Sequence, residues 1–301
     1  MSPVDKESDP VASIEIEIPA RQRDLGGFHV GRVLPSVQRR MVGPFIFFDH
    51  LGPLVLKAPV PRSADVRPHP HIGLSTVTYL FEGEMTHRDS LGIEQVIRPG
   101  EVNWMTSGRG ISHSERFDGM RERGGNLHGL QAWVALPAAH EEDEPSFEHY
   151  GRGELEVVEA PGVRARLIAG SAFGATSGVR THSPMFYAHV EMAPGARAEL
   201  PAGYSERAAY VVTGSVESAG RVVSARTMIV FSAGTAPVLS ALEPTSVMVL
   251  GGEPVGPRHV WWNFVSSRKE RIEQAKRDWA DGRFSLPPSD NVERIPLPEG
   301  A

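Results

Sequence analysis

Short runs of β-branched and aromatic residues, each closed by a glycine or proline turn, restrict the fold of this chain most strongly. The 31 glycines and 25 prolines are scattered, and they separate the runs at the spacing typical of a β-sandwich or barrel. The sequence therefore predicts an all-β fold. The predicted strands are Ser75–Phe81, Val102–Thr106, Leu130–Leu136, Arg164–Ala169, Met185–Met192, Ala208–Val212, Met228–Phe231, Ser246–Leu250 and Val260–Phe264.

One helix is predicted near the C-terminus. Ile272, Ala275 and Trp279 recur at helical spacing, which indicates an apolar stripe that packs on the β body. The segment Ser267–Glu270 has the form of a capping box, and Gly282 can end the helix.

A weak internal repeat indicates two similar halves. Tyr79–Met85 resembles Tyr210–Val216, and both segments end a strand in a turn glycine. Aligning them brings His69 and His71 onto positions 200 and 202, which hold leucine and alanine, so only the first half has a histidine pair. The acidic stretch 138–145 is interpreted as a linker, with a surface loop inside one domain as the alternative. The predicted organisation is an N-terminal metal-binding barrel over 13–137, a degenerate second barrel over 145–265, the helix within 266–283 and a proline-rich, extended tail over 284–301.

Two motifs about forty residues apart carry the candidate functional residues. His69 and His71 flank one proline, and His113 and Glu115 flank one serine, so each pair lies on one face of a strand. If the two strands meet across a barrel, three imidazoles and a carboxylate converge on one ion and leave coordination positions open, as a catalytic metal requires. The chain has no cysteine, so any metal must be held by nitrogen and oxygen.

Composition excludes several classes of function. The formal net charge of −6 gives no electrostatic case for direct nucleic-acid binding. No apolar run approaches the roughly 18 residues of a membrane span, and residues 1–12 lack the apolar core of a signal peptide. The expected location is cytoplasmic.

The segments His69–Gly83 (HPHIGLSTVTYLFEG) and Gly100–Phe117 (GEVNWMTSGRGISHSERF) together resemble the pirin family of the cupin superfamily. The resemblance implies a double cupin, in which two antiparallel β-barrels face each other and the N-terminal one holds the metal. A glutamate common in the broader cupin pattern is replaced here by Ser75, so Glu115 would supply the carboxylate. The ligands implied by the resemblance are His69, His71, His113 and Glu115.

The same resemblance implies an activity. Bacterial pirin-like proteins are associated with quercetin 2,3-dioxygenase activity, in which O₂ opens a flavonol and carbon monoxide is released. The expected partners are a flavonol-like aromatic substrate and O₂, and the expected cofactor is one divalent metal: Fe²⁺, or else Mn, Co, Ni, Cu or Zn. Glu115 would then serve as both ligand and general base. Two alternatives stay open: a regulatory protein whose metal or redox state changes its fit to a protein partner, and a metal-stabilised structural module without turnover.

Other polar residues receive weaker interpretations. For His87 and Asp89, a solvated turn is at least as expected as support of the ligands. Trp104 is expected in the core rather than in a substrate wall. Arg109 can orient Glu115 or face solvent, and the sequence does not choose. No site role is assigned to the remaining histidines of interest, which are His128, His149, His182, His189 and His259.

Overall fold

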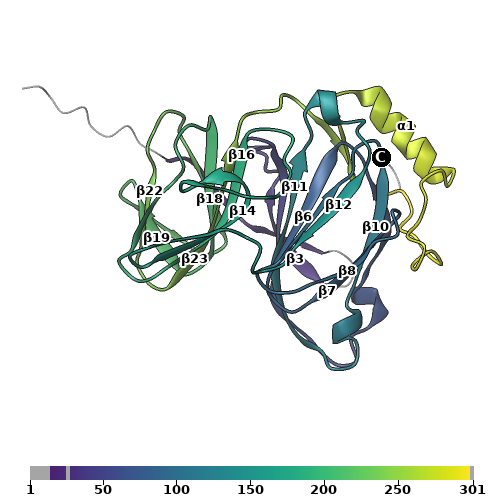
Figure 1. Cartoon of the computed structure of the whole chain (residues 1–301), viewed down its shortest axis with the longest axis horizontal. Helices are drawn as coiled ribbons and strands as arrows, with labels where there is room; N and C mark the ends of the chain where they lie inside the picture. Colours follow the sequence, from purple (N-terminus) through teal and green to yellow (C-terminus); the bar gives the residue numbers. More distant parts are fainter. Residues whose placement is uncertain (1–13, 25–27, 299–301) are drawn as a thin grey trace, which may run out of the picture.

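Of the 301 residues, the computed structural model describes 14–24 and 28–298. The start of the predicted first barrel, the polar N-terminus and the end of the predicted tail lie outside these ranges. Figure 1 shows two lobes of strands side by side, with helix α1 (Lys269–Ala280) on the far side of the first lobe. Among the described residues, no helix is long and apolar enough to cross a membrane.

The first lobe is built from two antiparallel sheets. The larger sheet runs in the order β12 (Ser146–Tyr150), β9 (Val102–Thr106), β6 (Leu74–Glu82), β11 (Gly125–Ala135), β4 (Phe45–Leu56), β3 (His29–Leu34) and β2 (Arg21–Asp24). The smaller sheet runs in the order β5 (Val66–His71), β10 (Ile111–Arg116), β7 (Met85–Asp89) and β8 (Glu94–Ile97). Short 3-10 turns connect some of these strands at Arg62–Ala64, Asp118–Met120 and Ala138–His140.

The second lobe repeats this arrangement. Its larger sheet runs β1 (Ile14–Pro19), β21 (Thr227–Phe231), β18 (Glu206–Thr213), β23 (Thr245–Gly252), β16 (Met185–Met192), β14 (Val163–Ala172) and β13 (Val157–Ala160), with β15 (Ala175–Thr176) paired to β14. Its smaller sheet runs β17 (Arg197–Glu199), β22 (Val238–Ala241), β19 (Ser215–Ser218) and β20 (Arg221–Ser224). A separate hairpin, β24 (His259–Trp261) and β25 (Phe264–Ser266), precedes α1.

The strand orders of the two lobes correspond one to one. The series β9-β6-β11-β4-β3 matches β21-β18-β23-β16-β14, and β5-β10-β7-β8 matches β17-β22-β19-β20. Tyr79 in β6 and Tyr210 in β18 occupy matching strands, as the sequence repeat predicts. The predicted all-β fold of two barrels with a short C-terminal helix is confirmed.

Each lobe takes an edge strand from outside its own stretch of sequence. Strand β1, which precedes the first lobe, pairs with β21 in the second. Strand β12, which follows the first lobe, pairs with β9 in the first. This exchange covers an open edge in each sheet and ties the two lobes together.

A core common to both lobes lies where the two larger sheets pack together. Phe48 and Tyr79 of the first lobe belong to the same buried cluster as Tyr187 and Tyr210 of the second. Trp104 is 2% exposed in this cluster, which confirms its predicted place in the core. Burial of each such side chain stabilises the fold by roughly 1.5–3 kcal/mol.

Three histidines without a predicted site role form polar contacts in this core. The Tyr210 hydroxyl lies 2.7 Å from His50 Nδ1, and His50 Nε2 lies 2.7 Å from His128 Nε2. The Tyr79 hydroxyl lies 3.0 Å from His189 Nδ1. The tyrosine hydroxyls and imidazole nitrogens buried between the two sheets are therefore hydrogen-bonded to one another, as buried polar groups require.

Three local predictions are wrong because tertiary contacts override local patterns. The predicted strand Val260–Phe264 is interrupted: it runs from the end of β24 through the hairpin turn to the first residue of β25, with a positive φ of 50° at Trp262. The predicted capping box does not form: the residue before α1 is Arg268, and the Ser267 hydroxyl donates to Glu141 at 3.0 Å. The acidic stretch is more than a solvated linker, because Glu141 is buried and pairs with Arg258 at 3.0 Å.

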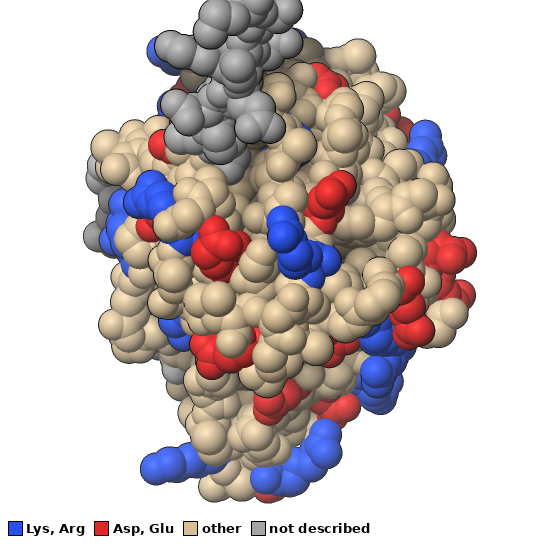
Figure 2. Space-filling model, turned by 90° about the vertical axis from the view of Figure 1, so that its left-hand side faces the viewer, with Lys and Arg blue, Asp and Glu red and all other residues tan. Residues whose placement is uncertain are grey.

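The outer end of the second lobe carries charges of both signs. Figure 2 shows basic and acidic side chains interspersed among uncharged residues on this face. The described part of this face therefore has no large patch of charges of a single sign.

Candidate metal centre

The two ligand motifs lie on neighbouring strands of the smaller sheet of the first lobe. Strands β5 and β10 are antiparallel, and His113 stands directly opposite His69. A register shift between His113 and Glu115 places Glu115 opposite Val66. The expectation that the two strands meet across a barrel is therefore wrong, because both pairs project from one face of one sheet.

Three imidazoles converge at this face. One ring nitrogen from each of His69, His71 and His113 lies within 4.8 Å of the others. Metal–nitrogen distances of about 2.0–2.1 Å place neighbouring donor atoms roughly 3.0–3.4 Å apart. Small inward rotations of the rings would therefore bring the three nitrogens onto one ion.

Hydrogen bonds fix which nitrogen of two of these rings is free. His69 Nδ1 lies 2.9 Å from the Arg67 carbonyl, and His71 Nδ1 lies 3.2 Å from the Asn263 carbonyl. A carbonyl only accepts, so each Nδ1 carries the proton and donates. The Nε2 lone pairs are left for a metal, which is the arrangement that orients imidazole ligands in metalloproteins.

The third ring is oriented through a chain of two further side chains. His113 Nδ1 lies 3.3 Å from His87 Nδ1, and His87 Nε2 lies 2.9 Å from Asp89 Oδ2. The carboxylate accepts from His87 Nε2–H, so His87 Nδ1 can accept from His113 Nδ1–H. His113 Nε2 is then a buried lone pair, and it has no hydrogen-bond partner among the described residues. An orphaned nitrogen of this kind fits a metal ligand.

The solvated-turn interpretation of His87 and Asp89 is wrong. His87 is 5% exposed and Asp89 is fully buried. The His87 ring stacks on Phe147 of β12 with centroids 4.4 Å apart, so the exchanged strand helps to bury it. Only the segment Ser90–Gly92 forms the turn, because β7 extends to Asp89.

Burial keeps the three imidazoles neutral. Desolvation lowers the pKa of His69 to about 4, while its hydrogen bond to the Arg67 carbonyl acts in the opposite direction. Desolvation also holds the pKa of His71 and of His113 well below the ordinary value, and the neighbouring histidines lower both further. Neutral imidazole is the form that ligates a metal.

Glu115 lies near the histidines but outside their group, because no carboxylate oxygen is within 4.8 Å of all three nitrogens. It accepts a hydrogen bond of 2.7 Å from Gln131 Nε2. Burial raises the pKa of Glu115 to about 7, while hydrogen bonds from Gln131 and Thr78 act in the opposite direction. A divalent ion beside this carboxyl would favour its ionised form.

A cavity of about 860 Å³ adjoins the cluster, and His69 and Glu115 line it directly. Phe47 and Trp133 stack on one another in its wall with centroids 4.0 Å apart, and the Trp133 and His71 rings are nearly perpendicular with centroids 5.1 Å apart. Trp133 Nε1 is buried and has no partner among the described residues. The cavity therefore has an aromatic wall beside the histidine cluster, as small-molecule sites often do.

Sequence reasoning missed these wall residues. Gln131 and Trp133 alternate on β11, the same i, i+2 spacing that identified the histidine pairs. That alternation is a signal, but only the position of β11 in the larger sheet shows that its face meets the cavity. The Arg32 guanidinium lies 4.4 Å from the Phe47 ring centre and donates to Asp49, also a wall residue.

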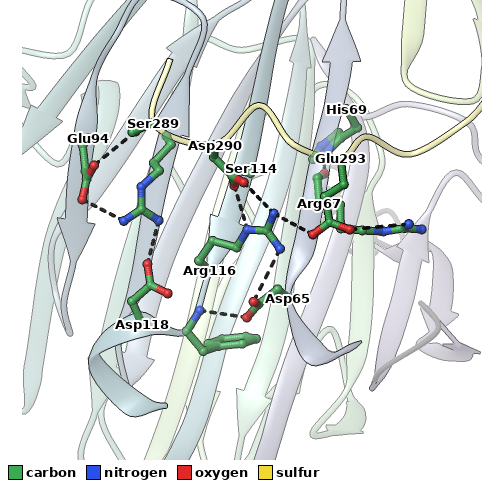
Figure 3. A network of polar contacts seen from close by, with 12 residues as sticks. Asp65, Arg67, His69, Glu94, Ser114, Arg116, Asp118, Ser289, Asp290 and Glu293 are labelled. Atoms are coloured by element: carbon green, nitrogen blue, oxygen red, sulfur yellow. Dashed lines mark hydrogen bonds and ion pairs between the residues drawn. The ribbon is translucent and has the colours of Figure 1, made fainter. Parts of the chain in front are cut away.

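The C-terminal tail crosses the outer face of the ligand strands (Figure 3). Arg116 follows Glu115 on β10 but points outward, where it donates to Asp290 at 2.7 and 2.8 Å and to Glu293 at 3.1 Å. Ser114 also donates to Asp290, at 2.6 Å. The tail therefore braces the strand whose inner face carries the candidate ligands.

Arg109 does not orient Glu115. Its side chain is 58% exposed and pairs with Glu144. Of the other histidines without a predicted role, His149 contacts Asn103 at 2.8 Å and His259 is exposed.

Comparison with known proteins finds a family match for each half of the chain. Residues 27–134 match the family model described as Pirin, and residues 187–285 match the Pirin C-terminal cupin domain. A pirin-like protein of Caulobacter vibrioides is 60% identical, over 95% of this chain and all of the relative. A crystal structure of quercetin 2,3-dioxygenase from Acinetobacter baumannii superposes with a TM-score of 0.86 at 34% identity, over 94% of both chains. The bacterial pirin YhhW of Escherichia coli, solved with nickel(II), shares the fold at 17% identity and a TM-score of 0.63.

Proposed function

Because the chain belongs to the pirin family, we propose that it is a metal-dependent dioxygenase that opens flavonols such as quercetin with O₂ and releases carbon monoxide. The observation that carries the proposal is the convergence of three neutral imidazoles beside a cavity of about 860 Å³. The similarity to a quercetin 2,3-dioxygenase supports it. A structural metal site would be closed by protein ligands, whereas this one adjoins space for a small molecule.

The ion in this proposal is held by Nε2 of His69, His71 and His113, with Glu115 as a fourth ligand or a nearby carboxylate. Fe²⁺ is the proposed occupant, and a set of three nitrogens and one oxygen also accepts Mn, Co, Ni, Cu or Zn. When bound, a divalent ion supplies Lewis acidity that makes a flavonol hydroxyl easier to deprotonate.

The chain's own residues position the substrate and move the proton. The stacked pair of Phe47 and Trp133 offers a flat apolar wall against which a planar flavonol can lie. The Glu115 carboxylate takes the hydroxyl proton, and the Gln131 amide holds that carboxylate in place.

The test loads metal-free protein separately with Fe²⁺, Mn²⁺, Co²⁺, Ni²⁺ and Cu²⁺ without oxygen, and then adds quercetin and air. Loss of the flavonol absorbance together with CO release measures turnover. We expect metal-dependent turnover that falls about 10²- to 10⁴-fold in Glu115→Gln, the range typical of a lost general base. The matched control His259→Ala alters an exposed histidine and should keep the full rate.

Two results would count against the proposal. Full turnover in Glu115→Gln with metal retained would refute the role of Glu115 as base. Metal bound by the wild-type protein without any loss of quercetin would refute the dioxygenase itself and favour a regulatory role acting through a protein partner.

A further inference from the structure

A second group of metal-ligating side chains lies between the two lobes. His140 ends the 3-10 turn Ala138–His140, Asp143 follows it, and His182 lies before β16 of the second lobe. One ligand atom from each of the three side chains lies within 4.8 Å of the others. His140 Nδ1 is 2.8 Å from Asp143 Oδ2, and His182 Nε2 is 3.9 Å from the same oxygen.

His182 is the most buried side chain of the three, and its ring centroid lies 5.2 Å from that of His140. It is nine-tenths buried, with 10% of its side chain exposed. Its Nε2 is directed at the Asp143 carboxylate from 3.9 Å, which is too far for a hydrogen bond. His182 forms no hydrogen bond with any residue in the described ranges, although a largely buried imidazole ordinarily has a partner.

The segment that carries the other two ligands is held in place by its backbone. Arg109 N–H donates to the Asp143 carbonyl at 2.9 Å, and Asp143 N–H donates to the His140 carbonyl at 3.2 Å. Between them, the buried carboxylate of Glu141 accepts from Arg258 and from the Ser267 backbone. A site on a fixed turn loses little entropy when it captures an ion.

We propose that His140, Asp143 and His182 bind a divalent transition-metal ion, with Zn²⁺ as the best-fitting ion. Tetrahedral zinc at about 2.0–2.1 Å from each ligand requires donor atoms roughly 3.3–3.4 Å apart. The observed 2.8 and 3.9 Å lie on either side of that value, so shifts of about half an ångström complete the site. Two imidazoles exclude Mg²⁺ and Ca²⁺, which prefer oxygen ligands, and the exposed side leaves a fourth position for water.

Such an ion would connect the two lobes. His140 and Asp143 belong to the loop that joins β11 to β12 within the first lobe, whereas His182 precedes β16 of the second. An ion bound to all three side chains would therefore link the two lobes and stabilise their relative arrangement by mass action. The site is made of residues separate from the three-histidine cluster, so the inference does not depend on the proposed dioxygenase.

The test counts ions by equilibrium dialysis of metal-free protein against Zn²⁺, followed by metal analysis. We expect two Zn²⁺ per wild-type chain, one in His182→Ala, one in His140→Ala and one in His69→Ala/His113→Ala. His259→Ala removes an exposed histidine elsewhere and should keep two. Two ions retained in His182→Ala, or a Kd above about 1 mM for the ion that remains in His69→Ala/His113→Ala, would overturn the proposal.

Thermal unfolding gives a second readout that needs no activity. In His69→Ala/His113→Ala, Zn²⁺ at 100 times its Kd should raise Tm by about 4 °C. Adding His182→Ala to that variant should abolish the rise. An equal rise with and without His182 would show that zinc acts elsewhere and would contradict the site.

Discussion

The buried ion pair between Arg116 and Asp290 should control whether the C-terminal tail stays docked on the ligand strands. Arg116 is 4% exposed and donates to Asp290 through two nitrogens, while Ser114 donates a third hydrogen bond. Asp290→Asn keeps the shape of the side chain and removes its charge. It therefore weakens all three hydrogen bonds without creating a cavity.

The expected cost follows from these contacts. A hydrogen bond to a charged group contributes about 1.5–3 kcal/mol. Arg116 keeps Asp65 at 3.5 Å and Glu293 at 3.1 Å in the variant, so we expect a net loss of about 2–3 kcal/mol rather than the full sum. We expect the tail to detach without global unfolding, so the loss should appear locally, as a roughly 30- to 150-fold drop in hydrogen-exchange protection within residues 285–298.

Hydrogen–deuterium exchange read by mass spectrometry measures this directly. Asp281→Asn is the matched control, because its carboxylate pairs with Arg283 at 2.8 Å but is 54% exposed. Exposed pairs contribute about 0–1 kcal/mol, so the control should change protection little. Equal protection in the two variants would refute the reasoning that the Arg116 ion pair docks the tail.

The same contact predicts a pH dependence. Burial acts to raise the pKa of Asp290, but the hydrogen bonds from Arg116 and Ser114 outweigh it, and the net pKa is lowered. A carboxyl with a lowered folded-state pKa stabilises the fold fully above its unfolded pKa of about 3.9, and that stability is lost as the pH falls through the folded pKa. Tail protection in the wild type should therefore decline below about pH 4, and this decline should be absent in Asp290→Asn.

Two further predictions concern the metal centre. His87→Ala removes the acceptor that orients His113, and we expect metal affinity to fall about 10- to 100-fold in a calorimetric titration; unchanged affinity would contradict the role of the Asp89–His87–His113 chain. Trp133→Ala removes half of the stacked aromatic wall, so KM for quercetin should rise about 3- to 10-fold with metal content unchanged, whereas an unaltered KM would show that the flavonol does not lie against this wall.

The fold was predictable because it depends on local alternation and turn residues. Strands Val102–Thr106 and Met185–Met192 begin and end where the sequence predicts. The Tyr79 and Tyr210 segments revealed the two-barrel repeat for the same reason, since each strand carries its own pattern. The exchange of β1 and β12 was not predictable, because strand pairing over such sequence distances leaves no local signal.

The candidate site also has features that were predictable from local sequence and features that were not. The motifs of His69 with His71 and of His113 with Glu115 were visible because the i, i+2 spacing is a property of one strand. The burial of His87 depends on Phe147, which comes from the exchanged strand β12 and is distant in sequence. Ser267 likewise lies in a local capping pattern, but its hydroxyl donates a hydrogen bond to the buried carboxylate of Glu141, 126 residues away in the sequence.

The most direct test of the central claim combines metal content with turnover in protein whose second site is removed. In His182→Ala, one Fe²⁺ per chain should bind and support quercetin cleavage with CO release. Adding His69→Ala and His113→Ala should abolish both the ion and the turnover while circular dichroism still reports a β-rich fold. Retention of the ion with unchanged affinity in that folded variant would contradict the assignment of the three-histidine cluster as the metal centre.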